Sequence, residues 1–264
     1  MEVIINAIIL GIIQGLTEFL PVSSSGHLEI AEAILGENKK EDMLMTIVLH
    51  FATALATIVI FRKDLRKIFS DLLLFEKNES FNFSLKIIIS MIPISLLGFL
   101  YKDQITSFFN GELILVSAML IITGLLLLLA DKKKICTRNI KKKDAILIGI
   151  AQAVALLPGI SRSGATISTS VLLGVDKEKS ARFSFLMVVP VIFGMMAKTI
   201  YDGEIPYNES SLLPLFIGFI FAFLTGIFAC KWMIKLVKNS QLKYFSYYCF
   251  IIGSITMITT LWLS

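Results

Sequence analysis

The sequence has few cysteines and no basic N-terminal leader, and each absence excludes a class of protein. The three cysteines, Cys136, Cys230 and Cys249, are too few and too scattered to indicate a disulfide framework or a structural zinc site. The apolar segment that begins at Val3 follows Glu2 rather than basic residues, so it is a poor signal peptide. We therefore expect this segment to remain in the mature protein.

Long polar segments and a large excess of charge are also missing. The formal net charge is only +5 over 264 residues. Binding to nucleic acid requires an extensive basic face outside the membrane, and no polar segment is long enough to fold into a domain that carries one. We therefore expect no nucleic-acid partner.

Apolar residues dominate the chain. They make up 56% of the sequence, and the mean hydropathy is +0.80, whereas soluble domains are roughly 45–50% apolar. Six apolar segments approach the ~20 residues that are needed to cross a bilayer. They predict transmembrane helices over residues 43–61, 84–101, 113–130, 183–200, 212–230 and 245–263.

Two further apolar segments contain polar interruptions. Residues 3–35 are broken by Gln14, Glu18 and the run 21–27, and residues 145–174 are broken by Gln152 and the run 158–166. Each segment is either one broken span or a re-entrant hairpin that enters and leaves on the same side of the membrane.

The distribution of lysine and arginine favours the hairpins. With two hairpins, 20 of the 25 basic residues lie on one side, Arg162 lies within a hairpin, and the other side carries only Lys39, Lys40, Lys102 and Lys198. With two single crossings the basic loops fall on different sides. Basic loops mark the cytoplasmic side. The sequence thus predicts an all-α polytopic membrane protein with six transmembrane helices plus two re-entrant helical hairpins, and with both termini outside.

The two interrupted segments also resemble each other. The run Gly11-Ile-Ile-Gln14 matches 149–152, and Ser23-Ser24-Ser25-Gly26 matches 161–164, both at an offset of 138 residues. A single membrane domain, 1–264, would then contain a first repeat over 1–130 and a second over 131–264. Each repeat has one hairpin and three spans, so the second copy is inverted. Inverted-topology repeats place polar sites near the membrane midplane.

The first polar interruption concentrates acidic, imidazole and hydroxyl groups. An ionisable group at membrane depth costs ~3 kcal/mol on insertion scales, so Glu18, His27 and Arg162 indicate a functional site. Gln14 and Glu18 are spaced i, i+4 and share a helix face. The loop residues that follow are Ser23, Ser24, Ser25 and Gly26.

The second interruption has the composition of an anion cradle. Gly159 and Gly164 permit close backbone approach, and Arg162 offers a planar fork that suits phosphate oxygens. The hydroxyl groups belong to Ser161, Ser163 and Thr166. The alternative is that Arg162 simply pairs with Glu18. His50 lies within a predicted span and either faces this site or packs on a neighbouring helix.

At both interruptions the sequence resembles the bacterial undecaprenyl-diphosphate phosphatase family, the integral membrane enzymes linked to bacitracin resistance. The residues that carry the resemblance are Gln14-Gly-Leu-Thr-Glu18-Phe-Leu-Pro-Val-Ser23-Ser24-Ser25-Gly26-His27 and Pro158-Gly-Ile-Ser161-Arg162-Ser163-Gly164-Ala-Thr166. Many members carry a glutamate where this chain has Gln14. The resemblance covers essentially the whole chain.

The resemblance implies a reaction, a cofactor and a location. Undecaprenyl diphosphate and water would give undecaprenyl phosphate and inorganic phosphate, which recycles the carrier lipid for cell-wall synthesis in the bacterial cell membrane. It also implies a divalent metal. Mg²⁺ or Ca²⁺ would fit the oxygen donors of Glu18 and Gln14, although Gln14 is a neutral and weaker ligand.

These implications give each residue an expected role. Arg162 and the N–H and hydroxyl groups of residues 161–166 would bind the diphosphate. Ser23, Ser25 and Gly26 would bind it from the first loop. His27 would act as general acid or base, and either water or a serine, of which Ser24 is favoured, would attack phosphorus.

Two rival functions remain open at the level of sequence. Inverted repeats with broken helices are typical of secondary transporters, and a polyprenyl-phosphate carrier would need the same midplane anion site. An enzyme turns over in detergent, whereas a transporter needs two compartments.

Overall fold

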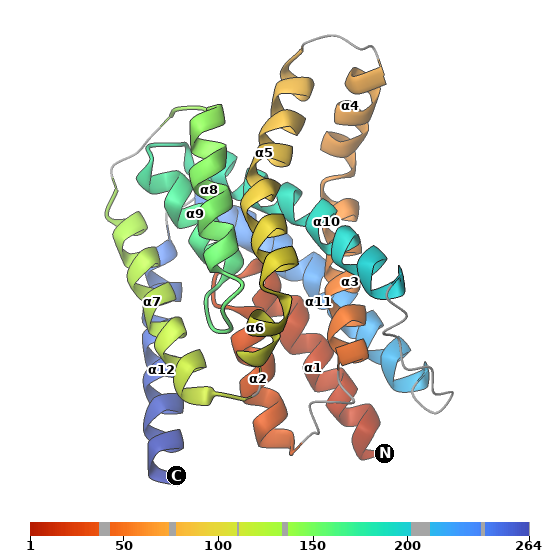
Figure 1. The fold of residues 1–264 in the computed structure, drawn as a ribbon, viewed down its shortest axis with the longest axis vertical. Helices are drawn as coiled ribbons and strands as arrows, with labels where there is room; N and C mark the ends of the chain where they lie inside the picture. Colours follow the sequence, from red (N-terminus) through yellow and green to blue (C-terminus); the bar gives the residue numbers. More distant parts are fainter. Residues whose placement is uncertain are drawn as a thin grey trace.

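The computed structural model describes residues 1–36, 43–73, 78–109, 111–133, 137–201, 212–238 and 241–263. Lys39, Lys40 and Cys136 lie outside these residues. The described chain is all-helical apart from turns and one isolated bridge between Arg138 and Val175 (Figure 1). Its helices are α1 (Glu2–Phe19), α2 (Ser24–Leu35), α3 (Met43–Ile60), α4 (Arg62–Leu73), α5 (Glu79–Leu100), α6 (Lys102–Ser107), α7 (Leu113–Asp131), α8 (Lys142–Val154), α9 (Arg162–Leu172), α10 (Lys177–Tyr201), α11 (Leu212–Lys238) and α12 (Leu242–Leu263).

Six described helices are long and apolar enough to cross a membrane: α1, α5, α7, α10, α11 and α12. Five of them confirm predicted spans. The sixth differs, because α1 continues through Gln14 and Glu18 and reaches 18 residues, or ~27 Å. The predicted span 43–61 qualifies only as Leu44–Ile60 taken together with α4, and the chain bends by 76° between them. The charged start of α4 ends the apolar run.

Two pairs of helices enter the bundle from opposite ends and turn in its middle. Figure 1 shows α1 and α2 rising from the end that holds both termini, and α8 and α9 descending from the other end. The turns that join the helices in each pair, 20–23 and 155–161, meet near the centre of the molecule.

The sequence explains why the helices stop at these turns. Leu20 has extended backbone, with φ −68° and ψ 138°, as expected for the residue before Pro21. The hydroxyl of Ser23 then accepts a hydrogen bond from the Gly26 N–H and caps α2. Ser161 caps α9 in the same way, through the N–H of Gly164. Each polar interruption is therefore a helix end followed by a capped helix start.

Close backbone contacts hold the bundle together around these turns. In lipid the hydrophobic effect does not drive helices together, so small residues that allow close approach become important. Gly11 on α1 packs on the carbonyl of Gly218 on α11, and Gly149 on α8 packs on that of Ser90 on α5. Beneath the first turn, Phe19 and Phe185 form a buried edge-to-face pair with centroids 5.7 Å apart.

Charged contacts gather at the end of the bundle where α8 begins. Arg138 donates two hydrogen bonds to the carboxylate of Asp144 and one to the carbonyl of Leu173. This clasp joins the segment before α8 to the end of α9. A second charged contact joins α10 to α4, where Arg182 pairs with Asp64.

Candidate functional site

The two central turns are in direct contact through glycine. A Cβ added to Gly26 would lie 3.0 Å from the Cα of Gly159. Gly159 itself has φ +93°, and a Cβ there would lie 2.3 Å from the carbonyl oxygen of Val116 on α7. Only glycine fits this conformation and this spacing. The second turn is thus pressed between α7 and the start of α2.

The carboxylate of Glu18 is the centre of the polar contacts. Its Oε2 accepts hydrogen bonds from Gln14 Nε2 at 3.1 Å and from Ser24 Oγ at 2.7 Å. Its Oε1 forms an ion pair with Nη2 of Arg162 from the other turn. Glu18 is 6% exposed and Gln14 is fully buried. The structure therefore brings together the acidic and basic interruptions, as the sequence predicts.

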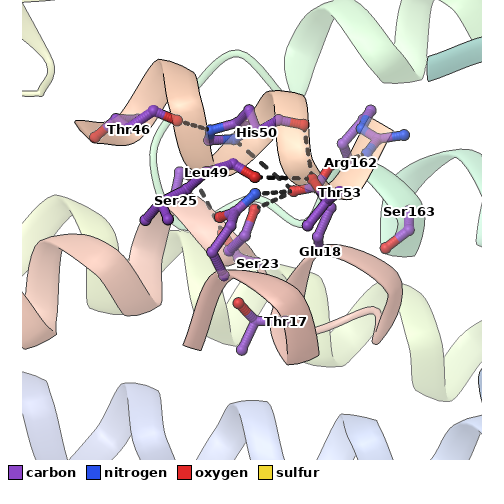
Figure 2. Close-up of polar contacts among 12 residues, drawn as sticks. Thr17, Glu18, Ser23, Ser25, Thr46, Leu49, His50, Thr53, Arg162 and Ser163 are labelled. Carbon is purple, nitrogen blue, oxygen red and sulfur yellow. Dashed lines mark hydrogen bonds and ion pairs between the residues drawn. The ribbon is translucent and has the colours of Figure 1, made fainter. Parts of the chain in front are cut away.

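His50 approaches the same carboxylate from α3. Figure 2 shows its ring above Glu18, with Arg162 to one side. Its Nε2 lies 3.8 Å from Glu18 Oε2, and its Nδ1 is 2.8 Å from the carbonyl of Thr46. The sequence left two readings open for His50, and the structure places it at the site.

Ser23 has an unusual backbone conformation and a structural role in the first turn. Ser23 caps α2 and is the one non-glycine residue with positive φ, +71°, among the described residues. Its hydroxyl lies 3.3 Å from that of Ser25. Such backbone strain persists where the surroundings over-determine it, which is frequent at functional sites.

The second turn is anchored on two neighbouring helices. Its Ser161 N–H donates to Thr123 Oγ1 on α7, which itself donates to the carbonyl of Gly159. The hydroxyl of Thr166 lies 2.7 Å from that of Ser184 on α10 and joins α9 to that helix. Ser163 donates at 3.4 Å to the carbonyl of Leu20 in the first turn.

His27 is held away from the Glu18 carboxylate. Its Nδ1 lies 2.8 Å from the carbonyl of Ser23, and its Nε2 lies 2.8 Å from the hydroxyl of Tyr248 on α12. The His27 and Tyr248 rings are stacked, with centroids 5.5 Å apart. Both ring nitrogens therefore have partners, and in the described part of the chain neither forms a hydrogen bond or ion pair with Glu18, Ser24 or Arg162.

The centre is electrostatically suited to an anion. Both α2 and α9 begin at the meeting turns, so two helix N-termini and their partial positive charges point there. Arg162 adds a full charge, and its Nη1 is buried without a hydrogen-bond partner in the described chain. An unpaired buried guanidinium nitrogen is costly, and a phosphate oxygen would satisfy it.

An oxygen donor for a cation lies next to Glu18, on the side chain of Gln14. Gln14 Oε1 is buried and has no hydrogen-bond partner among the described residues. No group of three or more His, Cys, Asp or Glu side chains that could hold a metal occurs in the part of the chain that the structure describes. A metal would therefore need further ligands to complete its coordination, such as amide, hydroxyl or phosphate oxygens. The orphaned amide oxygen and the carboxylate fit a divalent cation.

Sequence reasoning missed two residues that shape the site. Thr123 lies in an uninterrupted apolar run, where one hydroxyl group gives little signal. Tyr248 lies among the aromatic residues that start α12, and nothing in its neighbourhood indicates a partner 221 residues away.

Comparisons with known proteins show the family of the chain. The family described as "Bacitracin resistance protein BacA" matches residues 7–255. A protein named undecaprenyl-diphosphatase from Christiangramia forsetii is 58% identical over 257 residues, which cover 97% of each chain. Proteins of the same name from Bacteroides fragilis and Methanococcus vannielii are 46% and 45% identical, and the matches cover 97% and 92% of this chain and 97% and 95% of theirs. The chain therefore belongs to the bacitracin resistance protein BacA family.

Proposed function

We propose that the Glu18–Arg162 centre hydrolyses undecaprenyl diphosphate to undecaprenyl phosphate and inorganic phosphate. The observation that carries this function is the buried contact between Glu18 and Arg162 at two helix N-termini, in a chain whose relatives are named for this reaction. The activity recycles the carrier lipid for peptidoglycan synthesis and accounts for bacitracin resistance. The relatives' names favour it over the transporter and lipid-carrier alternatives.

Arg162 and the surrounding donors would bind the diphosphate. Phosphoryl transfer depends mainly on positioning and on neutralising charge at the phosphoryl oxygens. The free Nη1 of Arg162 and the N-terminal N–H groups of α2 and α9 supply that positive potential. Ser23, Ser25, Ser161 and Ser163 line the two turns that carry them.

Ser24 is the best placed nucleophile. Its hydroxyl already donates to Glu18 at 2.7 Å, which is the arrangement of a nucleophile and its general base. Attack of Ser24 Oγ on the terminal phosphorus would break the bond to the bridging oxygen, release undecaprenyl phosphate and leave the serine proton on Glu18. Water would then cleave the phosphoserine and release inorganic phosphate. In the alternative route, Glu18 orients water for direct attack.

The role of His27 as general acid or base stays a prediction. Both ring nitrogens already have hydrogen-bond partners, so His27 must break its contact with the Tyr248 hydroxyl or the Ser23 carbonyl before it can reach the substrate. Apo hydrogen bonds often rearrange in the substrate complex.

A divalent cation is a further part of the proposal. Glu18 and Gln14 would hold it, since the unpaired Gln14 Oε1 needs a partner. Bound there, it would neutralise charge on the diphosphate.

We also propose that the two helix pairs are re-entrant hairpins of an inverted repeat. At the 138-residue offset, Ser23 corresponds to Ser161 and Gly26 to Gly164, and both pairs make the same capping bond, at 3.2 Å and 3.0 Å. The same offset pairs Ser24 with Arg162, so the two residues that contact Glu18 from helix starts occupy equivalent positions.

Reciprocal contacts between the halves support the repeat. Gly124 of α7 packs on the carbonyl of Ser246 of α12, while Gly253 of α12 packs on that of Ser117 of α7. A two-fold relation between the halves predicts such reciprocal pairs. The same pattern holds for two other helix pairs. Gly11 brings α1 close to α11, and the equivalent Gly149 brings α8 close to α5.

The orientation follows from the basic segments. Figure 1 shows α4 and the start of α8 at one end and both termini at the other. We place the basic end in the cytoplasm of the bacterial cell and the termini outside. The polyprenyl tail would lie between spans in contact with lipid, and the site would open outward, where the carrier's diphosphate is released.

The test is phosphate release by the purified protein in detergent from undecaprenyl diphosphate. Multiple turnovers without a membrane are expected. Release only in sealed vesicles, or none from either preparation, would contradict the proposal and favour a transporter or carrier.

A further inference from the structure

We propose that His50 Nε2 is a metal ligand, which together with Glu18 and Gln14 forms a site for a first-row transition-metal dication. This inference deepens the proposed function, because it concerns the cation at the same centre. It differs from the all-oxygen Mg²⁺ or Ca²⁺ site that the two oxygen donors alone predict.

The orientation of the His50 ring carries the argument. Its Nδ1 faces the Thr46 carbonyl at 2.8 Å, and a carbonyl only accepts, so Nδ1 holds the proton. In the neutral ring Nε2 then presents its lone pair, and it faces Glu18 Oε2 at 3.8 Å. Metal-bound histidines are commonly held by this kind of bond from the other ring nitrogen to a backbone carbonyl.

The neighbouring donors have suitable spacing. Adjacent ligands of an octahedral ion with bonds near 2.1 Å are about 3.0 Å apart. Gln14 Nε2 and Ser24 Oγ lie 3.1 and 2.7 Å from Glu18 Oε2. The 3.8 Å between His50 Nε2 and Glu18 Oε2 exceeds this ideal spacing by about 0.8 Å. A small rotation of the two side chains would close the difference. A half-turn of the Gln14 amide would direct its orphaned Oε1 to the place that Nε2 now occupies.

The chemistry of the donors selects the class of cation. Ca²⁺ and Mg²⁺ prefer oxygen ligands, whereas imidazole favours first-row transition metals. One imidazole with a carboxylate and an amide oxygen would leave positions for water or phosphate oxygens. Such a set accepts Mn²⁺ and Zn²⁺ and favours them over Ca²⁺.

The chain offers a matched control, because it contains two histidines. Both nitrogens of His27 have partners, the Ser23 carbonyl and the Tyr248 hydroxyl. Any imidazole signal from a bound metal must therefore be assigned to His50 or His27 by replacing each in turn, in protein purified through a tag without histidine.

The experiment is Mn²⁺ binding followed by electron spin echo modulation from imidazole nitrogen. We expect the nitrogen signal in wild-type protein and in His27→Gln, and its loss in His50→Gln. The Mn²⁺ dissociation constant should rise by at least about ten-fold in His50→Gln, with a smaller change for Ca²⁺. Thermal unfolding of each variant checks that it is folded, and His50→Asn provides a second replacement.

Several results would overturn the inference: no Mn²⁺ binding by the wild type, Mn²⁺ bound without nitrogen coupling, or coupling that survives in His50→Gln. Phosphate release by the same wild-type preparation separates the two proposals. Release without nitrogen coupling rejects the His50 ligand alone, whereas absence of release under every metal tested rejects the proposed function.

Discussion

A single carboxylate organises the candidate site. Glu18 accepts from Gln14 and Ser24 through one oxygen and from Arg162 through the other, and His50 faces it from α3. Removing one partner of a buried ion pair leaves an uncompensated charge, which typically costs 3–5 kcal/mol. These side chains therefore depend on one another, and each also has a distinct place relative to the substrate.

Ser24 and Ser25 provide a comparison between neighbouring hydroxyl groups. We expect Ser24→Ala to lower phosphate release by about 10³-fold or more, because it removes the nucleophile. Ser25→Ala should keep activity within about ten-fold, since Ser25 contacts Ser23 and not Glu18. Steady-state kinetics in detergent would measure both. Equal activity of Ser24→Ala and wild type would remove Ser24 from the mechanism and favour direct attack by water.

The site was largely predictable at the scale of residues, and the gaps have physical causes. Glu18 and Arg162 stand out because ionisable groups are costly in an apolar segment, and this cost predicts that they meet. The partners of His27 were not predictable, because a stacked tyrosine from α12 leaves no local pattern. The position of His50 depends on the rotation of α3, which apolar composition on all sides does not determine.

At the scale of elements, glycine sets the distance between helices. A Cβ at Gly11 would lie 2.6 Å from the Gly218 carbonyl, whereas one at Gly98 would meet nothing within 4 Å. We expect Gly11→Ala to destabilise the protein by about 1–3 kcal/mol through overpacking. Gly98→Ala should be neutral or stabilise by up to about 1 kcal/mol. Thermal unfolding in detergent tests the pair, and equal melting temperatures would contradict the close α1–α11 contact.

The clasp before α8 should make stability depend on pH. Burial acts to raise the pKa of the Asp144 carboxyl, but hydrogen bonds from Arg138 and the Lys141 N–H outweigh it and hold the pKa below its ordinary value. A lowered folded-state pKa means that the stabilisation is complete above the unfolded pKa of ~3.9 and is lost as pH falls through the folded value.

Asp144→Asn should therefore lower stability at neutral pH by about 1–2 kcal/mol. The difference in stability between Asp144→Asn and wild type should become smaller at acidic pH. Melting curves at several pH values measure it, and a difference that is constant down to the lowest pH would argue against the ionised clasp.

At the scale of the whole molecule, five predicted spans are confirmed because apolar runs of about 20 residues have few alternatives in a bilayer. The boundary between span and hairpin was less predictable. α1 is long enough to cross although it carries Gln14 and Glu18, because a polar residue with a buried partner need not break a helix. The 76° bend after α3 likewise depends on where α4 packs.

The proposed orientation predicts which residues are accessible from outside. In a variant without its native cysteines, Glu2→Cys should react with a membrane-impermeant maleimide on intact cells. Lys142→Cys, at the start of α8, should react only after permeabilisation, because the basic end faces the cytoplasm. The reverse pattern, or labelling of both on intact cells, would contradict the topology.

The central claim is that the contact between Glu18 and Arg162 is the catalytic centre. It is tested most directly by phosphate release from undecaprenyl diphosphate by Arg162→Ala and Glu18→Ala, compared with Arg182→Ala. The control breaks another arginine–carboxylate pair, which Arg182 forms with Asp64 of α4 and which is more exposed than the Glu18–Arg162 pair. We predict that the first two variants lose at least about 10²-fold in activity while staying folded, and that Arg182→Ala retains it. Activity that survives in Arg162→Ala and Glu18→Ala would contradict the claim.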